Sequence, residues 1–188
     1  MRFAFTAALA PAFASAITLA VATPALAELK PGATAPLFTA DGSVAGQPFK
    51  VDLKAALKKG PVVLYFFPAA FTPGCNAEAH AFAEAIADFK AAGATVIGMT
   101  AGNTDQIAKF SSAYCAGKFP VAAATPAVAA SYDVVLKKPD GTASGYTSRT
   151  SYVIAPNGKI FFVHSDMSAA EHVSKTLAAV KRLGTARP

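Results

Sequence analysis

Two cysteines, Cys75 and Cys115, are the residues of this sequence best suited to covalent chemistry. Cys75 closes the segment Pro68-Ala69-Ala70-Phe71-Thr72-Pro73-Gly74-Cys75. Threonine is a good N-cap and proline suits the first helical position, so Thr72-Pro73 predicts the start of a helix. Unpaired N–H groups and the positive end of the helix dipole favour a thiolate there, and the thiolate is the nucleophilic form of cysteine. We therefore expect Cys75 to be a reactive thiol.

The residues around Cys75 suit attack on a peroxide. The Thr72 hydroxyl, three residues earlier in the chain, can donate a hydrogen bond to the sulfur or to a bound oxygen. Pro68 can shield the thiolate from solvent, and Gly74 lets the backbone come close to a substrate. A thiolate attacks one peroxide oxygen while nearby donors stabilise the charge on the leaving oxygen. The product would be a sulfenic acid on Cys75.

Strands and helices alternate around this segment, after a turn-rich lead-in. Apolar runs, helical spacing and turn residues predict the elements that follow. In order, these are a short helix over Asp52–Lys59, a strand over Val62–Phe67 buried on both faces, a helix from Thr72-Pro73 to Gly93, a strand over Thr95–Met99, a helix from Asn103 or Thr104 to Cys115, short elements within Val121–Ala130, a hairpin of residues 152–154 and 160–163 around Asn157-Gly158, and a helix from Ser168, with Glu171 in a capping box, to Gly184. This order indicates an α/β domain in which helices flank a central mixed β-sheet, and it looks like the thioredoxin-like arrangement.

The N-terminal residues have the pattern of an export signal. Arg2 precedes an apolar stretch over Phe3–Val21, and Ala25-Leu26-Ala27 has the small-x-small form of a cleavage site. We expect residues 1–27 to be a cleaved signal peptide and residues 28–188 to form one domain. The cleaved chain would be periplasmic or secreted, with no membrane attachment. A permanent membrane anchor is the alternative reading of the same stretch.

The charge pattern argues against a nucleic-acid partner. The formal net charge is +6, but the lysines are scattered and form no basic stripe interleaved with aromatic residues. A solvated surface accounts for them. In an oxidising compartment, two cysteines indicate first a structural disulfide, although a domain of this size does not need one for stability.

The pattern Pro68-x-x-x-Thr72-x-x-Cys75 after an apolar strand resembles the active-site motif of the peroxiredoxins, the AhpC/TSA family. Thr72-Pro73-Gly74-Cys75 followed by Glu78 is similar to the Q-type, or bacterioferritin comigratory protein, subgroup. The resemblance extends to Phe119-Pro120, to residues 131–134 and to Arg149 just before a strand.

This resemblance implies a thiol-dependent peroxidase that reduces hydrogen peroxide and organic hydroperoxides, with thioredoxin or a thioredoxin-like protein as the reductant. Such an enzyme would need no cofactor or metal, and it would be a monomer or a homodimer. Cys75 would be the peroxidatic cysteine. Thr72 and Arg149 would bind the peroxide oxygens, and Arg149 would also support the thiolate. Glu78 would either orient this arginine or lie on an ordinary helix surface.

The sequence departs from the Q-type pattern at His80, where many members carry a resolving cysteine. The helical period turns His80 away from Cys75, so we expect it to be exposed or structural. Three roles are open for Cys115: a resolving cysteine, the partner of Cys75 in a permanent disulfide, or an unpaired thiol with external resolution. As a resolving cysteine it would require a loop to unwind, because a disulfide needs the two Cα atoms within about 7 Å.

Other residues carry weaker predictions. We expect His164 and His172 to be strand-end or surface histidines, because neither has the spacing of a metal ligand. Phe71 could make the mouth of the site apolar and so favour organic hydroperoxides. Three other functions fit less well: a thiol–disulfide oxidoreductase would need a cysteine at position 78, an extracytoplasmic copper chaperone would need further soft ligands, and a non-catalytic redox-binding module would not need Thr72, Cys75 and Arg149 together.

Overall fold

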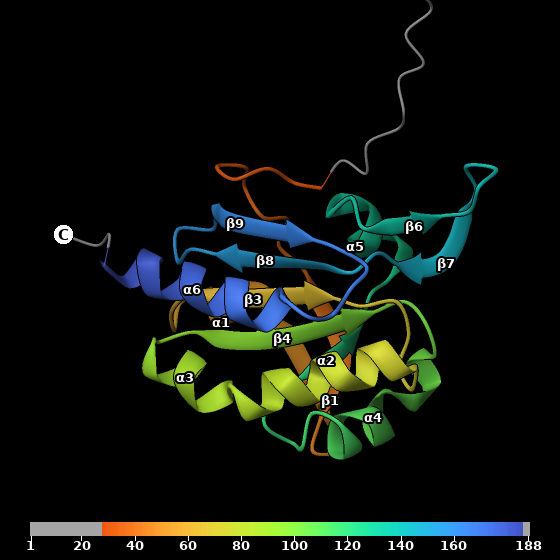
Figure 1. Ribbon diagram of the computed structural model, residues 1–188, viewed down its shortest axis with the longest axis horizontal. Coiled ribbons are helices and arrows are strands. Elements are labelled where there is room, and N and C mark those ends of the chain that lie inside the picture. Colours follow the sequence, from red (N-terminus) through yellow and green to blue (C-terminus); the bar gives the residue numbers. More distant parts are fainter. Residues whose placement is uncertain (1–27, 186–188) are drawn as a thin grey trace, which may run out of the picture.

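The computed structural model describes residues 28–185, which form a mixed β-sheet with helices on both faces (Figure 1). The signal peptide predicted for residues 1–27 lies outside the described residues. The strands are β1 (Thr39–Val44), β2 (Gln47–Asp52), β3 (Val62–Phe66), β4 (Thr95–Thr100), β5 (Val121–Ala123), β6 (Val135–Lys137), β7 (Ala143–Thr147), β8 (Thr150–Ile154) and β9 (Ile160–Ser165). The helices are α1 (Leu53–Leu57), α2 (Pro73–Glu84), α3 (Ile86–Ala91), the 3₁₀ turn η1 (Thr104–Gln106), α4 (Ile107–Ala113), α5 (Pro126–Ser131) and α6 (His172–Thr185).

The main sheet has seven strands in the order β2-β1-β5-β4-β3-β8-β9. At its centre, β3 pairs in parallel with β4 and antiparallel with β8, so that Leu64 lies between Ile97 and Tyr152. Every residue of β3 is buried, which accounts for its continuous apolar sequence. The predicted fold class, α/β with a central mixed sheet flanked by helices, is confirmed.

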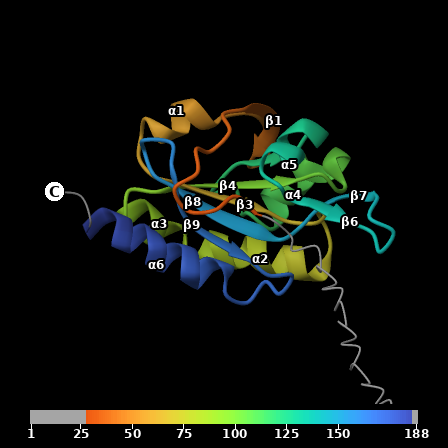
Figure 2. The same cartoon turned by 90° about the horizontal axis from the view of Figure 1, so that it is seen from above.

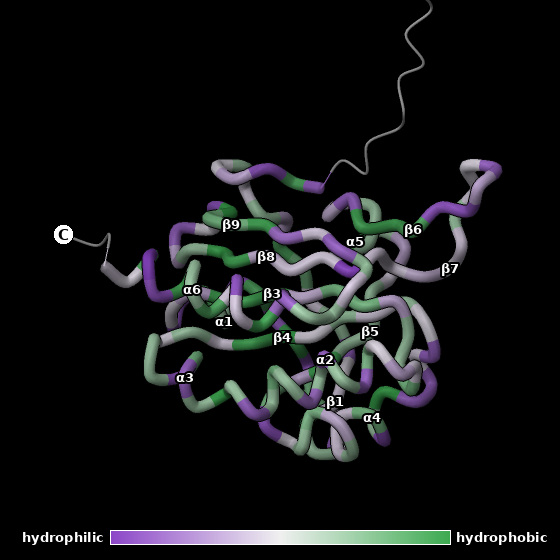
Figure 3. Tube along the Cα trace, viewed as in Figure 1, coloured by the Kyte–Doolittle hydropathy of each residue, from purple (hydrophilic) through white to green (hydrophobic). Residues whose placement is uncertain are grey.

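Two hydrophobic clusters cover the two faces of the sheet. Val63, Tyr65 and Phe67 point to the side of α2, α3, α4 and α6, where they join both cysteines. The alternate residues Val62, Leu64 and Phe66 point to the side of α1 and α5. Figure 2 shows these layers, with α1 and α5 on one side of the sheet and α2, α3 and α6 on the other. Hydrophobic residues run through β4 and β8, whereas the turn between β6 and β7 is largely hydrophilic (Figure 3).

The segment before residue 52 is a β-hairpin rather than an irregular lead-in. Strands β1 and β2 pair antiparallel, and Ala45 and Gly46 at the turn have φ angles of 52° and 78°. Strand β2 is almost entirely exposed and β1, with the sequence TADGSV, has few apolar residues, so neither has the clear alternation that predicts a strand. The small sheet of β6 and β7 also lacks a clear alternating pattern, since Thr147 is its only buried residue.

Several predicted helices have different bounds. The helix predicted from Asn103 or Thr104 to Cys115 is divided into η1 and α4, and α4 ends at Ala113. The helix predicted from Thr72 to Gly93 is divided into α2 and α3 at Ala85, whose φ and ψ angles of −81° and 0° interrupt the helical geometry. The last helix begins at His172 instead of Ser168. The Ser168 hydroxyl accepts a hydrogen bond from the Ala170 N–H at 3.4 Å, and residues 168–171 form bends and a turn, so the predicted capping box is absent. Within residues 28–185, no helix has the length and apolar character needed to cross a membrane.

Candidate active site

The loop that joins β3 to α2 is held at three carbonyl groups. The Thr147 hydroxyl donates to Phe67 O at 2.7 Å, and the Thr100 hydroxyl donates to Pro68 O at 3.0 Å. The Asn103 side-chain amide donates to Ala70 O at 2.8 Å. The donors come from β7, from β4 and from the segment after β4. Because each is a separate segment, the loop before Cys75 is fixed by the tertiary structure.

Cys75 lies in the first turn of α2, as predicted. Thr72 is the N-cap residue, Pro73 is the first helical residue, and the first helical hydrogen bond runs from Asn76 N–H to Thr72 O at 2.8 Å. The N–H groups of Gly74 and Cys75 therefore have no acceptor within the helix and can serve an anion. Cys75 is only 1% exposed and belongs to the same hydrophobic cluster as Phe67.

The Thr72 hydroxyl does not make the predicted hydrogen bond to the sulfur in this structure. It donates to Ala69 O at 3.0 Å, so its single proton is already used. A lone pair of the same oxygen remains able to accept a hydrogen bond from a protonated peroxide. The Thr72 hydroxyl therefore holds the loop, three residues before Cys75 in the chain. Phe71, which precedes it, has a left-handed backbone with φ of 61°.

Arg149 reaches Cys75 from a distant part of the chain. It lies directly before β8, and its Nη2 donates to Cys75 Sγ at 3.5 Å. Its Nη1 donates to Glu78, and its Nε donates to Met167 O at 2.9 Å. A Cβ atom at Gly74 would lie 3.3 Å from Arg149 Nη2. The glycine thus makes room for the arginine, a reason for its presence other than the predicted access of substrate.

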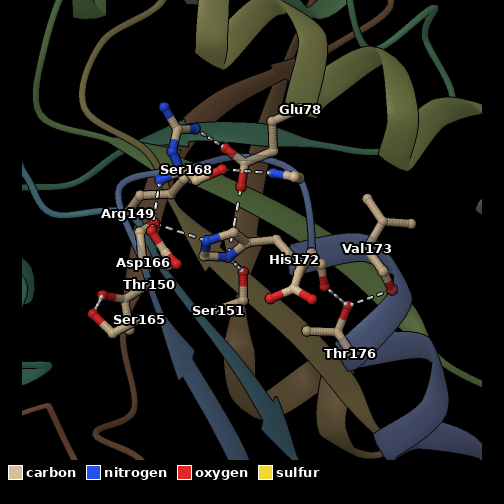
Figure 4. Close-up of polar contacts among 12 residues, drawn as sticks. Glu78, Arg149, Thr150, Ser151, Ser165, Asp166, Ser168, His172, Val173 and Thr176 are labelled. Carbon is tan, nitrogen blue, oxygen red and sulfur yellow. Dashed lines mark hydrogen bonds and ion pairs between the residues drawn. The ribbon is translucent and has the colours of Figure 1, made fainter.

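Glu78 is a buried partner of this arginine and not a surface residue. It is 1% exposed, and its carboxylate pairs with Arg149 (Figure 4). Burial raises the pKa of Glu78 to about 7, and the charge of Arg149 offsets part of this rise. Burial by itself would lower the pKa of Arg149, but the combined influence of Glu78 and Cys75 is larger, so the pKa of Arg149 is raised. The site therefore contains a linked set of Cys75, Arg149 and Glu78.

The prediction that His172 is a surface or strand-end histidine is wrong. Its side chain is fully buried at the start of α6, 2.8 Å from Ser151 Oγ through Nδ1 and 2.9 Å from Asp166 O through Nε2 (Figure 4). Burial lowers the pKa of His172 to about 4, so the ring is neutral near pH 7. The sequence does contain a signal, because His172 shares a helical stripe with Thr176 and Ala179, both of which are buried.

The other histidines agree with their predictions. His80 is exposed on α2 and lies 3.3 Å from Glu84 Oε1, one turn further along the helix. His164 is a half-buried residue near the end of β9, and burial lowers its pKa. Within residues 28–185, no three His, Cys, Asp or Glu side chains are grouped so that they could hold a metal ion.

Cys115 lies two residues after α4, which ends at Ala113 instead of at the predicted Cys115. It is fully buried in the same hydrophobic cluster as Cys75, and both cysteines are free thiols. Burial raises the pKa of the Cys115 thiol well above its usual range. The structure therefore has the reduced form of the site, without a disulfide between Cys75 and Cys115.

Comparison with known proteins agrees with this geometry. The AhpC/TSA family matches residues 31–163. A putative peroxiredoxin of Mycobacterium tuberculosis is 32% identical over 152 residues, which cover 78% of this chain and 92% of that protein. The chloroplastic peroxiredoxin Q of Sedum lineare is 30% identical over 161 residues, which cover 84% of this chain and 81% of that protein.

Solved structures give the same result. The crystal structure of peroxidoxin BcpB from Mycobacterium tuberculosis superposes with a TM-score of 0.72 at 31% identity, covering 85% of this chain and 99% of that one. The bacterioferritin comigratory protein of Xanthomonas campestris, described by its alkyl peroxide reduction activity, has a TM-score of 0.66 at 25% identity and covers 77% of this chain and 91% of that one. These matches do not favour a copper chaperone or a non-catalytic module. The chain belongs to the AhpC/TSA family and is a thiol-dependent peroxidase of the peroxiredoxin class.

Proposed function

We propose that Cys75 is the peroxidatic residue and that Arg149 prepares it for attack on a peroxide. The observation that carries this proposal is the contact of Arg149 Nη2 with Cys75 Sγ at 3.5 Å, at the start of a helix. Positive charge and unpaired N–H groups at one point stabilise a thiolate and the charge that develops on a leaving oxygen. Cys75 is buried, and Pro68, whose carbonyl is held by the Thr100 hydroxyl, would help to keep the sulfur away from bulk solvent.

The proposed reaction begins with attack of the Cys75 thiolate on one peroxide oxygen. A sulfur–oxygen bond forms as the O–O bond breaks, and the leaving oxygen takes a proton and departs as water or an alcohol. The cysteine is oxidised to a sulfenic acid and the peroxide is reduced. Thr72 would accept a hydrogen bond from the bound peroxide through its oxygen, while Arg149 would donate to the peroxide oxygens.

A comparison of variants tests this assignment. Peroxide consumption with dithiothreitol as the reductant should be lost in Cys75→Ser and retained in Cys115→Ser, since dithiothreitol can itself attack the sulfenic acid. Equal rates for Cys75→Ser and the wild type would contradict the proposal.

We propose further that Cys115 resolves the sulfenic acid. Its thiol would displace water from Cys75 and form a disulfide, which an external dithiol then reduces. Support comes from the hydrophobic cluster that the two cysteines share and from the turn around Cys115, where Ala116 and Gly117 have φ angles of 47° and 64°. Because Cys115 is fully buried, the segment after α4 must open before the sulfurs meet.

The opening has a defined restraint. Lys118 Nζ donates to Ala83 O at 3.0 Å and so ties the segment after Cys115 to α2. Lys118→Met should release this tie and speed disulfide formation after peroxide treatment, with Lys109→Met as the control. Mass mapping would detect the disulfide, and a persistent Cys75 sulfenic acid in the wild type with unmodified Cys115 would contradict the resolving role.

Thioredoxin or a thioredoxin-like protein is the proposed reductant, as expected for the family. A thioredoxin whose resolving cysteine is changed to serine should form a mixed disulfide with the oxidised wild-type protein. If dithiothreitol supports turnover but no thioredoxin-like protein forms this adduct, the reductant belongs to another class.

The Phe71 ring supports a preference for organic hydroperoxides. It is half-buried and packs edge-on against Phe110 and Tyr114, with ring centroids 5.7 and 5.6 Å apart. Phe71→Ala should lower kcat/KM for cumene hydroperoxide more than for hydrogen peroxide. An equal change for both substrates would contradict a role in substrate preference.

We also propose export by cleavage after Ala27, on the basis of Arg2, the apolar stretch and Ala25-Leu26-Ala27. Expression in a bacterial host should give a periplasmic protein whose measured mass begins at Glu28. A full-length mass, or a product confined to the membrane fraction, would contradict this proposal.

A further inference from the structure

His172 is a buried polar residue to which the proposed peroxidase chemistry gives no role. Its side chain is fully buried, yet it lies at the junction of β8, α6 and the segment that joins β9 to α6. Burying a histidine costs free energy unless both ring nitrogens find hydrogen-bond partners. Its two partners therefore indicate what it holds in place.

The contacts of His172 fix both the orientation and the tautomer of the ring. Asp166 O is a carbonyl and can only accept, so Nε2 carries the proton and donates to it at 2.9 Å. Because the ring is neutral, Nδ1 accepts from the Ser151 hydroxyl at 2.8 Å. The groups with charge that face the ring are Arg149, Glu78 and Asp166, and a second histidine, His164, lies with its ring centroid 4.6 Å away.

His172 and Arg149 are anchored to neighbouring carbonyl groups of one segment. His172 Nε2 donates to Asp166 O, and Arg149 Nε donates to the next carbonyl, Met167 O, at 2.9 Å. The Asp166 N–H in turn donates to Arg149 O at 3.2 Å. A shift of the Asp166 carbonyl would therefore displace the carbonyl that orients the guanidinium (Figure 4).

A second route leads through Glu78. Arg149 binds one carboxylate oxygen, Oε2, whereas Oε1 is buried without a hydrogen-bond partner within the described residues. Nδ1 of His172 lies 3.7 Å from Oε1. The imidazole therefore lies beside the unpaired carboxylate oxygen, where it would limit rotation of the carboxylate.

We propose that His172 is a positioning residue for Arg149, acting through the Asp166–Met167 carbonyls and through the contact with Glu78, and that it thereby sets how the guanidinium meets Cys75. The proposal rests on the proposed peroxidase function only for its catalytic consequence. The positioning itself concerns the reactivity of the Cys75 thiol and can be measured without turnover.

Three substitutions separate the two routes. His172→Gln places an amide nitrogen near the position of Nε2 and can keep the bond to Asp166 O. His172→Asn places polar atoms near Nδ1 and can keep only the contact with Ser151. His172→Ala removes both. His80→Ala, an exposed histidine on α2, is the matched control.

The readouts are the rate of Cys75 alkylation by iodoacetamide across a pH series, mapped by mass spectrometry, and kcat/KM for hydrogen peroxide, with thermal unfolding as the check on folding. We expect His172→Ala to slow alkylation at neutral pH and to lower kcat/KM by about tenfold or more, the scale typical of a misplaced catalytic group. His172→Gln should keep most of the wild-type alkylation rate and kcat/KM, whereas His172→Asn should keep little of either. His80→Ala should match the wild type.

A folded His172→Ala variant that is destabilised but whose Cys75 is alkylated at the wild-type rate would mean that His172 is purely structural, and this result would overturn the proposal. Equal losses in His172→Gln and His172→Asn would overturn the route through Asp166. If the wild type shows no Cys75-dependent peroxidase activity, the proposed function fails, while the alkylation rates still decide the positioning role.

Discussion

Replacing Arg149 by methionine perturbs the site at its centre, because one guanidinium contacts both Cys75 and Glu78. The substitution keeps a long apolar side chain but leaves the Glu78 carboxyl buried without its cation. Removing one partner of a buried ion pair destabilises a protein by about 3–5 kcal/mol. Burial already raises the pKa of Glu78 to about 7, so the carboxyl can take up a proton and limit this cost at neutral pH.

The pH dependence of the variant follows from the same group. Without Arg149 the pKa of Glu78 should rise further above its ordinary value of 4.5, because the influence that lowers it is gone. A carboxyl whose pKa is raised in the folded state contributes stability that is fully present below the unfolded pKa and is lost as the pH rises through the folded pKa. Arg149→Met should therefore lose stability progressively above pH 4.5 and well past neutrality.

The double variant Glu78→Gln with Arg149→Met separates stability from activity. Replacing the carboxyl by a neutral amide removes the buried charge, so most of the lost unfolding free energy should return. Peroxidase activity should not return, because the donor to the sulfur and to the leaving oxygen is still absent. A lost donor of this kind lowers the rate by about 10²–10³-fold.

The assays are urea unfolding at several pH values and peroxide consumption with dithiothreitol. Arg182→Met is the matched control, because Arg182 is exposed on α6 and lies over the Phe162 ring. A destabilisation below about 1 kcal/mol in Arg149→Met would refute the buried-pair reasoning. Recovery of activity in the double variant would refute the catalytic role of Arg149.

Three further predictions concern single groups. Gly74→Ala should lower kcat/KM for peroxide with little loss of thermal stability, since its new Cβ would lie 3.3 Å from Arg149 Nη2. Thr72→Val should slow peroxide consumption and lower the free energy of unfolding by about 1 kcal/mol in urea, because the hydrogen bond to Ala69 O is lost. Thr72→Ser should keep the wild-type rate and stability. Ser111→Ala should cost about 1–3 kcal/mol of unfolding free energy without changing activity, because Ser111 Oγ accepts from the Gly46 N–H at 2.9 Å and would leave it unpaired.

The elements that could be predicted from sequence are those with strong local signals. The buried strand β3, the parallel strand β4 and the hairpin of β8 and β9 follow from apolar runs and from Asn157-Gly158. The hairpin of β1 and β2 could not be predicted, because β2 is almost entirely exposed and β1 has few apolar residues, so neither shows an alternating apolar pattern. The break at Ala85 between α2 and α3 has no glycine or proline to mark it.

The sequence by itself determined where Cys75 lies: the apolar strand, Pro68 and Thr72-Pro73 place it at the start of a helix, a position that favours a thiolate. Only the tertiary structure decided what surrounds that thiol. Antiparallel pairing of β8 with β3 brings Arg149 to the end of the strand from which the Cys75 loop emerges. Burial then decides the rest, because a carboxyl at Glu78 and an imidazole at His172 acquire their partners only when the packing of α2 and α6 removes them from water.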